Sequence, residues 1–297
     1  MVLPAETSVM KTKFLALAAV LLLVPLSTMA AESPLQGIWL VETASLDASR
    51  NHAFVVHDGV YSCLSCSPSY SIPADGAFHA IPAGPTRDEL AVLVINPQEV
   101  QISERKDGLL VSNAIHRVSD SGASKHVEYQ DHTGKQPVVS RFVYARMENP
   151  PDGAHAISGA WVATRYEHLS NSGRFFTLAV NGNRLRMSNP QGQGFEAVMD
   201  GSRAVFTGSP IVTSVSVMQL ARHRIRVTYF NDGQVVGKST YHVLPNGVEM
   251  KVSYENPVDG SELAYTARLQ HTILDEGSHA LGGGIGMLAA QPIRARR

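Results

Sequence analysis

The sequence predicts an all-β protein of two tandem antiparallel up-and-down β-barrels, and two observations carry this prediction. First, the motif Gly-x-Trp occurs twice, at 37–39 and at 159–161, and each time it opens a long segment with the same order of turns. Second, apolar and polar residues alternate with a period of two between those turns, as in strands that have one face exposed to solvent. About eight strands per segment suit a closed barrel, because closure removes exposed sheet edges. Two β-sandwiches are the alternative fold.

The turn residues recur in the same order in both segments. Asp-Gly between alternating runs is the strongest local signal of a β-hairpin, because glycine accepts a positive φ at little cost. The two segments therefore read as copies of one meander. Aligning the two tryptophans brings together Asp75-Gly76 with Asp200-Gly201, Asp107-Gly108 with Asp232-Gly233, Gly122 with Gly247, Thr133-Gly134 with Asp259-Gly260, and Tyr144-Ala145-Arg146-Met147 with Thr266-Ala267-Arg268-Leu269.

Strand boundaries follow from the alternation between these turns. In the second copy, Ile225, Val227 and Tyr229 fall on one face of a strand and polar residues fall on the other. No window after residue 31 keeps helical spacing without a Gly or Pro, so no helix is predicted. The predicted strands are 89–95, 100–104, 109–118, 125–129 and 138–146 in the first copy, and 175–180, 184–188, 194–199, 214–218, 224–229, 235–243, 248–254 and 262–269 in the second.

The N-terminal region, 1–31, has the pattern of a cleavable signal peptide. Lys11 and Lys13 precede a short apolar stretch, and small residues mark a cleavage site after Ala30 or Ala31. Met10 is the better start of this segment. No cysteine follows the cleavage site for lipidation, and no second long apolar run occurs. We therefore expect a periplasmic or secreted protein with no stable membrane span, and an uncleaved anchor helix is the alternative.

The remaining chain divides into four parts. We expect the first barrel at 34–148, a stiff linker at 149–155 around Pro150-Pro151-Asp152-Gly153, and the second barrel at 156–271. Residues 272–297 carry a triple glycine and a basic end, so we expect a disordered C-terminal tail there.

Composition argues against several classes of function. A net charge of −1 with dispersed basic residues offers no field to attract nucleic acid. The twelve histidines lack metal-ligand spacing, and the closest groupings are His126 with His132 and Glu167 with His168. Gly-x-Ser-x-Gly and a carboxylate pair in an apolar setting are missing too. We therefore expect no catalytic residue, no metal and no cofactor.

The Gly-x-Trp motif, with an Arg on the last strand of each copy, resembles the signature of the lipocalin or calycin group. In that group the Trp closes the barrel floor and the Arg packs across it. The resemblance implies that Trp39 meets Arg141 or Arg146, and that Trp161 meets Arg268. Three stretches are also similar to an uncharacterised family of exported bacterial lipocalin-like proteins, which implies a fold and a compartment: Cys63-Leu64-Ser65-Cys66-Ser67-Pro68, Pro151-Asp152-Gly153-Ala154-His155-Ala156-Ile157-Ser158-Gly159, and Asp232-Gly233-Gln234-Val235-Val236.

Cys63 and Cys66 are the only cysteines, and export favours their oxidation to a disulfide. A redox-active or oxidant-sensing pair is the alternative, although Tyr61 and Pro68 indicate a strand and a turn rather than the helix that lowers a thiol pKa. A zinc site would need two further ligands, which the spacing does not provide.

Aromatic residues are the remaining candidates for a ligand site. Tyr61, Tyr70, Phe175 and Tyr229 lie on predicted strands whose inner faces would line a cavity or fill a core. The leading hypothesis is an exported non-enzymatic protein that binds a small apolar molecule or acts as an envelope stress or interaction module. The alternatives are a thiol-disulfide redox protein using Cys63 and Cys66, and a purely structural module that binds another envelope protein.

Overall fold

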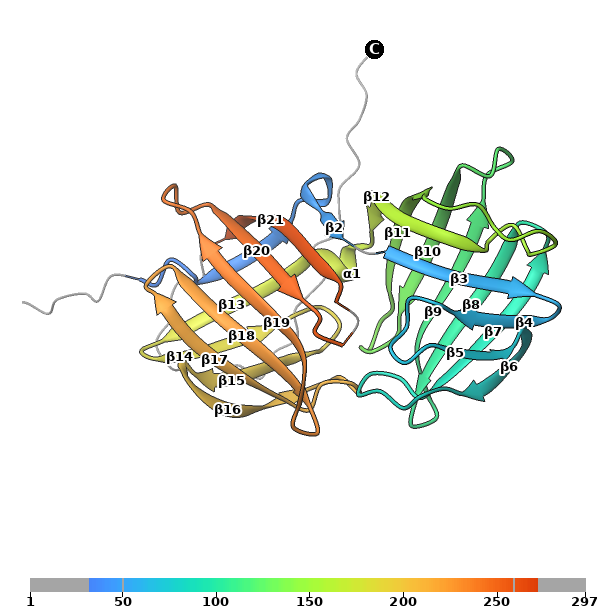
Figure 1. The fold of residues 1–297 in the computed structure, drawn as a ribbon. Coiled ribbons are helices and arrows are strands. Elements are labelled where there is room, and N and C mark those ends of the chain that lie inside the picture. Colours follow the sequence, from blue (N-terminus) through green and yellow to red (C-terminus); the bar gives the residue numbers. More distant parts are fainter. Residues whose placement is uncertain (1–31, 50, 259, 272–297) are drawn as a thin grey trace, which may run out of the picture. The chain divides into compact units, whose positions relative to one another are not determined.

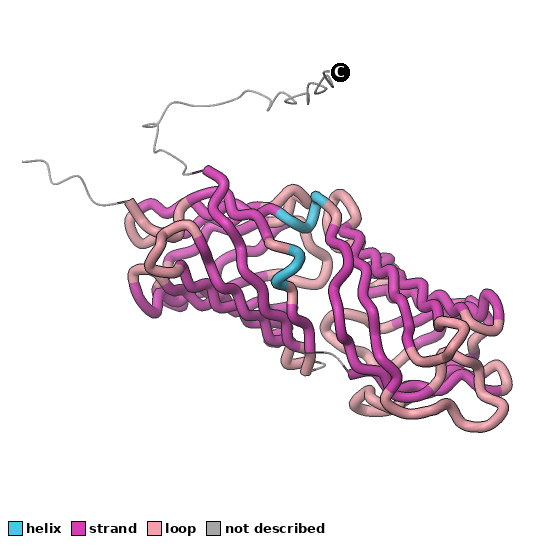
Figure 2. The backbone as a smooth tube through the Cα atoms, turned by 90° about the horizontal axis from the view of Figure 1, so that it is seen from above, coloured by secondary structure: helices cyan, strands magenta, loops and turns pink. Residues whose placement is uncertain are grey.

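The computed structural model describes residues 32–49, 51–258 and 260–271, and nearly all of them lie in strands or in turns between strands. The predicted signal peptide and C-terminal tail lie outside the described residues. Two single-turn helices, η1 (Thr43–Ser45) and α1 (Asn171–Arg174), are the cyan segments of Figure 2. Within the same part of the chain, no helix has the length and hydropathy needed to span a bilayer. The all-β prediction is confirmed.

The first barrel is a ten-stranded antiparallel sheet with the order β5-β4-β3-β12-β11-β10-β9-β8-β7-β6 (Figure 1). Its two end strands, β5 and β6, follow each other in the chain and lie in contact, so the sheet curls round on itself. The strands are β3 (Asn51–His57), β4 (Val60–Cys63), β5 (Tyr70–Pro73), β6 (Asp75–Ala80), β7 (Glu89–Asn96), β8 (Glu99–Lys106), β9 (Leu109–Val118), β10 (Ser124–Asp131), β11 (Val138–Arg146) and β12 (Gly159–Leu169).

The second barrel is closed by hydrogen bonding, because β1 pairs with both β13 and β21. The short strand β2 adds to the far part of β21, which makes this sheet eleven-stranded. The strands are β1 (Gly37–Val41), β2 (Asp47–Ser49), β13 (Phe175–Asn181), β14 (Arg184–Ser188), β15 (Gly194–Val198), β16 (Asp200–Thr207), β17 (Ser214–Ala221), β18 (Arg224–Asn231), β19 (Gln234–Val243), β20 (Glu249–Glu255) and β21 (Glu262–His271).

The strand that carries each Gly-x-Trp motif lies in the barrel opposite to the predicted one. β1, with Trp39, belongs to the second barrel, and β12, with Trp161, pairs with β11 and β3 of the first. The first barrel is therefore one continuous stretch from β3 to β12, inserted between β2 and β13 of the second (Figure 1). The predicted limits, 34–148 and 156–271, are therefore wrong, because β1 and β2 belong to the second barrel and β12 belongs to the first.

The predicted linker, Pro150-Pro151-Asp152-Gly153, connects β11 to β12 of the same barrel. The chain that follows it is fastened to this barrel, since Ser158 Oγ accepts a hydrogen bond of 2.9 Å from the backbone N–H of Val56. The chain passes from one barrel to the other after β2 and again between β12 and β13. The proline-rich composition identified a loop, but it carries no information on which strands the loop joins.

Each barrel has about two strands more than predicted, and the Asp-Gly pairs at Asp75 and Asp200 explain part of the difference. We predicted turns there, yet both residues begin strands, β6 and β16, with a register shift against the next strand. The glycines that follow have φ angles of 81° and 91°. Each aspartate side chain accepts the N–H of the residue two positions on, at 2.9 and 2.8 Å. The Asp-Gly pair therefore forms a bulge at the start of a strand.

Positions 125 residues apart occupy equivalent places in the two barrels, from β6 to β10 and from β16 to β20. The hairpins at Asp107-Gly108 and Asp232-Gly233 set this offset, and both residues of each pair have positive φ, as the prediction required. The pairing registers on both sides of these turns keep the same offset.

One ring contact recurs with its partners exchanged. The guanidinium carbon of Arg105 lies 3.6 Å from the ring centroid of Phe78, and that of Arg203 lies 3.9 Å from the centroid of Phe230. Arg203 is equivalent to Phe78, and Phe230 to Arg105, so the same cation–π contact is made in both barrels with opposite roles. The two barrels share this contact although no residue of it is conserved between them.

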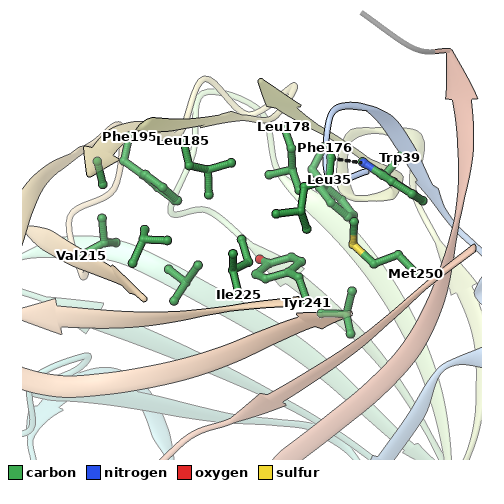
Figure 3. Close-up of a cluster of buried hydrophobic side chains, with 14 of the residues drawn as sticks. Leu35, Trp39, Phe176, Leu178, Leu185, Phe195, Val215, Ile225, Tyr241 and Met250 are labelled. Carbon is green, nitrogen blue, oxygen red and sulfur yellow. Dashed lines mark hydrogen bonds between the residues drawn. The ribbon is translucent and has the colours of Figure 1, made fainter. Parts of the chain in front are cut away.

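A buried tryptophan closes one end of each barrel. The indole Nε1 of Trp39 donates to the carbonyl of Leu35 at 3.0 Å, and that of Trp161 donates to the carbonyl of Ile157 at 2.9 Å. Figure 3 shows this bond and the apolar side chains beneath it in the second barrel. We call these ends the tryptophan ends and the opposite ends the open ends.

Candidate ligand-binding cavity

Arg146 fastens the tryptophan end of the first barrel. Its guanidinium carbon lies 4.0 Å from the ring of Trp161. Its N–H groups donate to the carbonyls of Gly122 at 2.6 Å, and of Ala156 and Ser158 at 2.7 Å each. Burial lowers the pKa of this guanidinium. Arg146 therefore meets Trp161 and not Trp39, so the implied pairing of Trp39 with Arg141 or Arg146 is wrong.

Arg268 has no such role, and the implied pair with Trp161 is also wrong. Its guanidinium binds the carboxylates of Glu42 at 2.8 Å and Glu249 at 3.1 Å, on an exposed face. These partners, Glu42 first, raise the pKa of Arg268. The residue opposite Trp39 on β21 is Leu269. Aligning Arg146 with Arg268 was thus one residue out of register, and a slip of one residue turns a strand's side chains to the other face.

A cavity of about 460 Å³ lies at the open ends, and both barrels line it. Residues 33 to 271 belong to one compact unit. The first barrel contributes one set of side chains to the wall: Arg87, Glu104, Val111, Tyr129 and Asp131.

The second barrel contributes the equivalent set, each residue 125 positions further along the chain. These five matching positions, with Thr86 and its equivalent Ile211 as a sixth, indicate that the cavity follows from the barrel architecture and is not an accident of one loop. The second set is Val212, Tyr229, Val236, Tyr254 and Asn256.

Hydrogen bonds between the two barrels border the cavity. The side-chain amide of Gln193 donates to Thr133 Oγ1 at 3.1 Å, and both residues line the cavity. Close by, the backbone N–H of Lys135 donates to the carbonyl of Gln191 at 2.8 Å. Asn231 Nδ2 also donates to the carbonyl of Pro85. The wall is therefore held by contacts that involve both main chain and side chains.

The first-barrel wall carries a charge pair. Arg87 Nη1 donates to Glu104 Oε1, and Ser112 Oγ donates to Glu104 Oε2 at 2.6 Å. The Glu104 carboxylate raises the pKa of Arg87, so the guanidinium stays charged. Burial raises the pKa of the nearby Tyr70 phenol, although Arg87 opposes this effect. This wall presents paired charges at neutral pH.

The second-barrel wall is uncharged at the same positions. Val212 replaces Arg87, and Tyr229 replaces Glu104. The Tyr229 hydroxyl lies 3.1 Å from the Tyr241 hydroxyl. Burial, followed by the effect of Tyr241, raises the pKa of Tyr229 well above its ordinary value, so the phenol remains neutral. The two walls thus differ in charge while they share a backbone framework.

Three of the four predicted aromatic residues lie on an inner face. Tyr61 is buried in the first core with its ring centroid 6.5 Å from that of Tyr70, which packs against the same core. Tyr229 lines the cavity. Phe175 is not part of the second core, whereas its neighbour Phe176 is, because adjacent strand residues point to opposite faces.

The sequence prediction missed Glu104, although β8 contains the signal for it. Val100 is buried and Ile102 packs against the core, so the period of two places Glu104 on the same inner face. A carboxylate at an inward position needs a partner, and Arg87 supplies it. Arg87 lies between β6 and β7, where no periodicity could have identified it.

Lys125 is a second charged residue inside the first barrel, at the tryptophan end and away from the cavity. Its side chain is fully buried, and Nζ lies between 4.7 and 4.9 Å from the ring centroids of Phe54, Tyr144 and Trp161. The equivalent residue in the second barrel is Met250, also fully buried and close to the tryptophan (Figure 3).

Cys63 and Cys66 form a disulfide between the end of β4 and the following loop. Cys63 packs in the first core with 5% of its surface exposed, and residues 64–69 form bends and not a helix. Over the described chain, no group of three His, Cys, Asp or Glu side chains is arranged to hold a metal ion. His126 and His132 have separate neighbours, Glu167 at 3.7 Å and Asn113 at 2.6 Å.

Comparison with known proteins adds no family. No protein-family model matches the chain, and no curated protein matches its sequence.

Proposed function

We propose that this is an exported, non-enzymatic protein that binds a small molecule in the cavity at the open ends of its barrels. The observation that carries the proposal is the set of six equivalent positions from each barrel that line one cavity. A volume of about 460 Å³ falls in the range of small-molecule sites, which are concave and partly apolar with a few placed polar groups.

The chemistry of the wall supports binding over catalysis. Glu104 accepts hydrogen bonds from both Arg87 and Ser112, so both of its carboxylate oxygens already have donors. The Tyr229 phenol has a raised pKa and is a poor nucleophile at neutral pH. These groups can orient a ligand by hydrogen bonds without changing it.

Export, duplication and lipocalin-like ancestry are parts of the same proposal. The signal-peptide pattern at 1–31 supports export, and a disulfide suits an oxidising compartment. The repeated Gly-x-Trp motif and the constant offset of equivalent positions support duplication of one barrel unit. A tryptophan at the closed end of each barrel supports the lipocalin-like resemblance.

The test is direct detection of a bound ligand. The full chain is expressed with its own N-terminus and purified from the exported fraction, and native mass spectrometry is expected to show a non-covalent adduct. Titration with the neutral fluorescent probe N-phenyl-1-naphthylamine is expected to show one saturable site. A Val212→Trp variant, which fills the cavity, should abolish both signals.

Val205→Trp is the matched control, because Val205 is 70% exposed and lies outside the cavity lining. This control should bind the probe as the wild type does. The proposal fails if neither an adduct nor saturable probe binding is seen, or if Val212→Trp binds the probe with unchanged affinity.

A further inference from the structure

Where the two walls of the cavity differ, the first-barrel wall carries the more polar side chain. At three equivalent positions the first barrel has Thr86, Arg87 and Glu104, whereas the second has Ile211, Val212 and Tyr229. A ligand that lies across these positions meets a charged pair on one side and the uncharged side chains of Ile211, Val212 and Tyr229 on the other. The asymmetry fits a molecule with one polar and one apolar end.

The first-barrel wall can donate further hydrogen bonds to a ligand. A guanidinium has five N–H donors, and among the described residues that of Arg87 donates one hydrogen bond, to Glu104. The Arg87 side chain is 30% exposed and that of Glu104 is 20% exposed, and both residues line the cavity. A ligand carbonyl or hydroxyl oxygen can therefore accept from Arg87 without breaking the pair.

The charges of this wall select against an anionic headgroup. Glu104 neutralises Arg87, and Asp131 adds one further negative charge to the lining. The opposite wall carries no compensating cation at the equivalent positions, since Val212, Tyr229 and Asn256 stand there. A carboxylate would approach a wall of net negative charge, whereas an amide or alcohol would not.

We infer that the ligand is an uncharged amphiphile whose carbonyl or hydroxyl headgroup binds at Arg87 and Glu104 and whose apolar part lies against Val212 and Val236. This inference rests on the proposed function and names its ligand class. Each buried methylene of the apolar part should tighten binding roughly fourfold.

The experiment compares three probes of equal chain length: decanamide, decanoate and decyltrimethylammonium. Each displaces N-phenyl-1-naphthylamine from the full-length wild-type protein at pH 7. Decanamide is expected to bind at least tenfold more tightly than decanoate and more tightly than the ammonium, which has no acceptor for Arg87. Equal or tighter binding of decanoate would overturn the inference.

Two variants test which residues cause the headgroup preference. Each places second-barrel residues at the equivalent positions of the first barrel. Arg87→Val combined with Glu104→Tyr removes both charges together, and the preference for decanamide over decyltrimethylammonium should fall to within about twofold. Asp131→Asn removes one negative charge from the cavity lining. Decanoate should then bind this variant several-fold more tightly than it binds the wild type. Because the second variant is a mild change, it remains informative if the double variant folds poorly.

Failure of this inference is distinguishable from failure of the proposed function. If N-phenyl-1-naphthylamine binds but the probes show no headgroup preference, or if the variants leave that preference intact, the ligand class is wrong and the cavity remains a binding site. If no probe binds the wild-type protein, both proposals are wrong.

Discussion

Removing the Arg146 side chain should destabilise the first barrel far more than removing that of Arg268. The Arg146 guanidinium joins carbonyls of three separate residues at the tryptophan end and covers the ring of Trp161. Arg268 is the residue that the sequence alignment matched with Arg146, but it binds two carboxylates on an exposed face. The two arginines therefore form a matched pair with different surroundings.

The expected cost follows from the contacts of Arg146. Three hydrogen bonds from a charged donor contribute about 1 kcal/mol each at a partly buried site, and the cation–π contact adds about 0.5–1 kcal/mol. Desolvation of the guanidinium, which lowers the pKa of Arg146, offsets part of this sum. We expect Arg146→Ala to lose about 3 kcal/mol, which corresponds to a fall in Tm of roughly 6–12 °C for a chain of this size.

The assay is thermal and guanidinium chloride unfolding of both alanine variants, followed by circular dichroism. Arg268→Ala should lose clearly less stability than Arg146→Ala, because exposed ion pairs contribute little. Arg146→Lys should recover only a small part of the loss, since an ammonium cannot reach three carbonyls in the geometry of the planar guanidinium. Equal losses for Arg146→Ala and Arg268→Ala would refute the assignment of Arg146 as the residue that fastens this end.

Further outcomes are expected from three other features. Replacing Lys125 by Met, the residue at this place in the second barrel, should leave stability unchanged or raise it by up to about 2 kcal/mol, because the desolvation cost of a buried ammonium is removed and an apolar side chain packs in its place; a clear loss in guanidinium chloride unfolding would contradict this. The N–H of Asp107 bonds to Asp88 and, ahead of Lys106, lowers the pKa of that carboxyl. The stability it adds is present above its ordinary pKa and is lost as pH falls through the lowered value, so Asp88→Asn should flatten the decline of Tm below pH 4, and an unchanged slope would count against the bond. Reducing the disulfide of Cys63 and Cys66, which closes a loop of four residues, should cost about 2 kcal/mol and leave N-phenyl-1-naphthylamine affinity within twofold; a tenfold change in that affinity would show that the disulfide shapes the cavity.

Local chemistry explains which parts of the fold could be predicted. Asp107-Gly108 and Asp232-Gly233 are hairpin turns because their backbone angles suit those residue types whatever the rest of the chain does. The alternation in β18 likewise reports directly which residues face the core. Both signals depend on neighbours in the sequence, so they survive without knowledge of the fold.

Strand pairing depends on distant residues, and there the prediction was wrong. β1 and β12 both carry the Gly-x-Trp motif, and each buries the tryptophan of its motif. No local feature therefore indicates which barrel each strand joins. The register opposite Trp39 is equally non-local, because it shifts at an irregularity between Ile38 and Trp39.

The candidate site could be predicted only in part, for the same reason. Tyr229 was found from strand periodicity, and Glu104 could have been found in the same way. Arg87 lies in a loop, and the two walls form one cavity only because the open ends of the barrels approach each other. Neither feature produces a periodic pattern in the sequence. A cavity shared by equivalent positions becomes visible only once the two barrels are superimposed by their registers.

Because the first barrel is inserted between β2 and β13, the two barrels become complete at different times during synthesis of the chain. Every strand of the first barrel is available once β12 has appeared. The second barrel begins with β1 and ends with β21, and Glu42, which follows β1, meets Arg268 of β21 across a separation of 226 positions. Its earliest strand, which carries Trp39, must therefore wait for β13 before it can pair and for β21 before the barrel closes. Such a delayed closure is slow and exposes an apolar edge meanwhile, so the segment around β1 is where a holding chaperone would have most to protect.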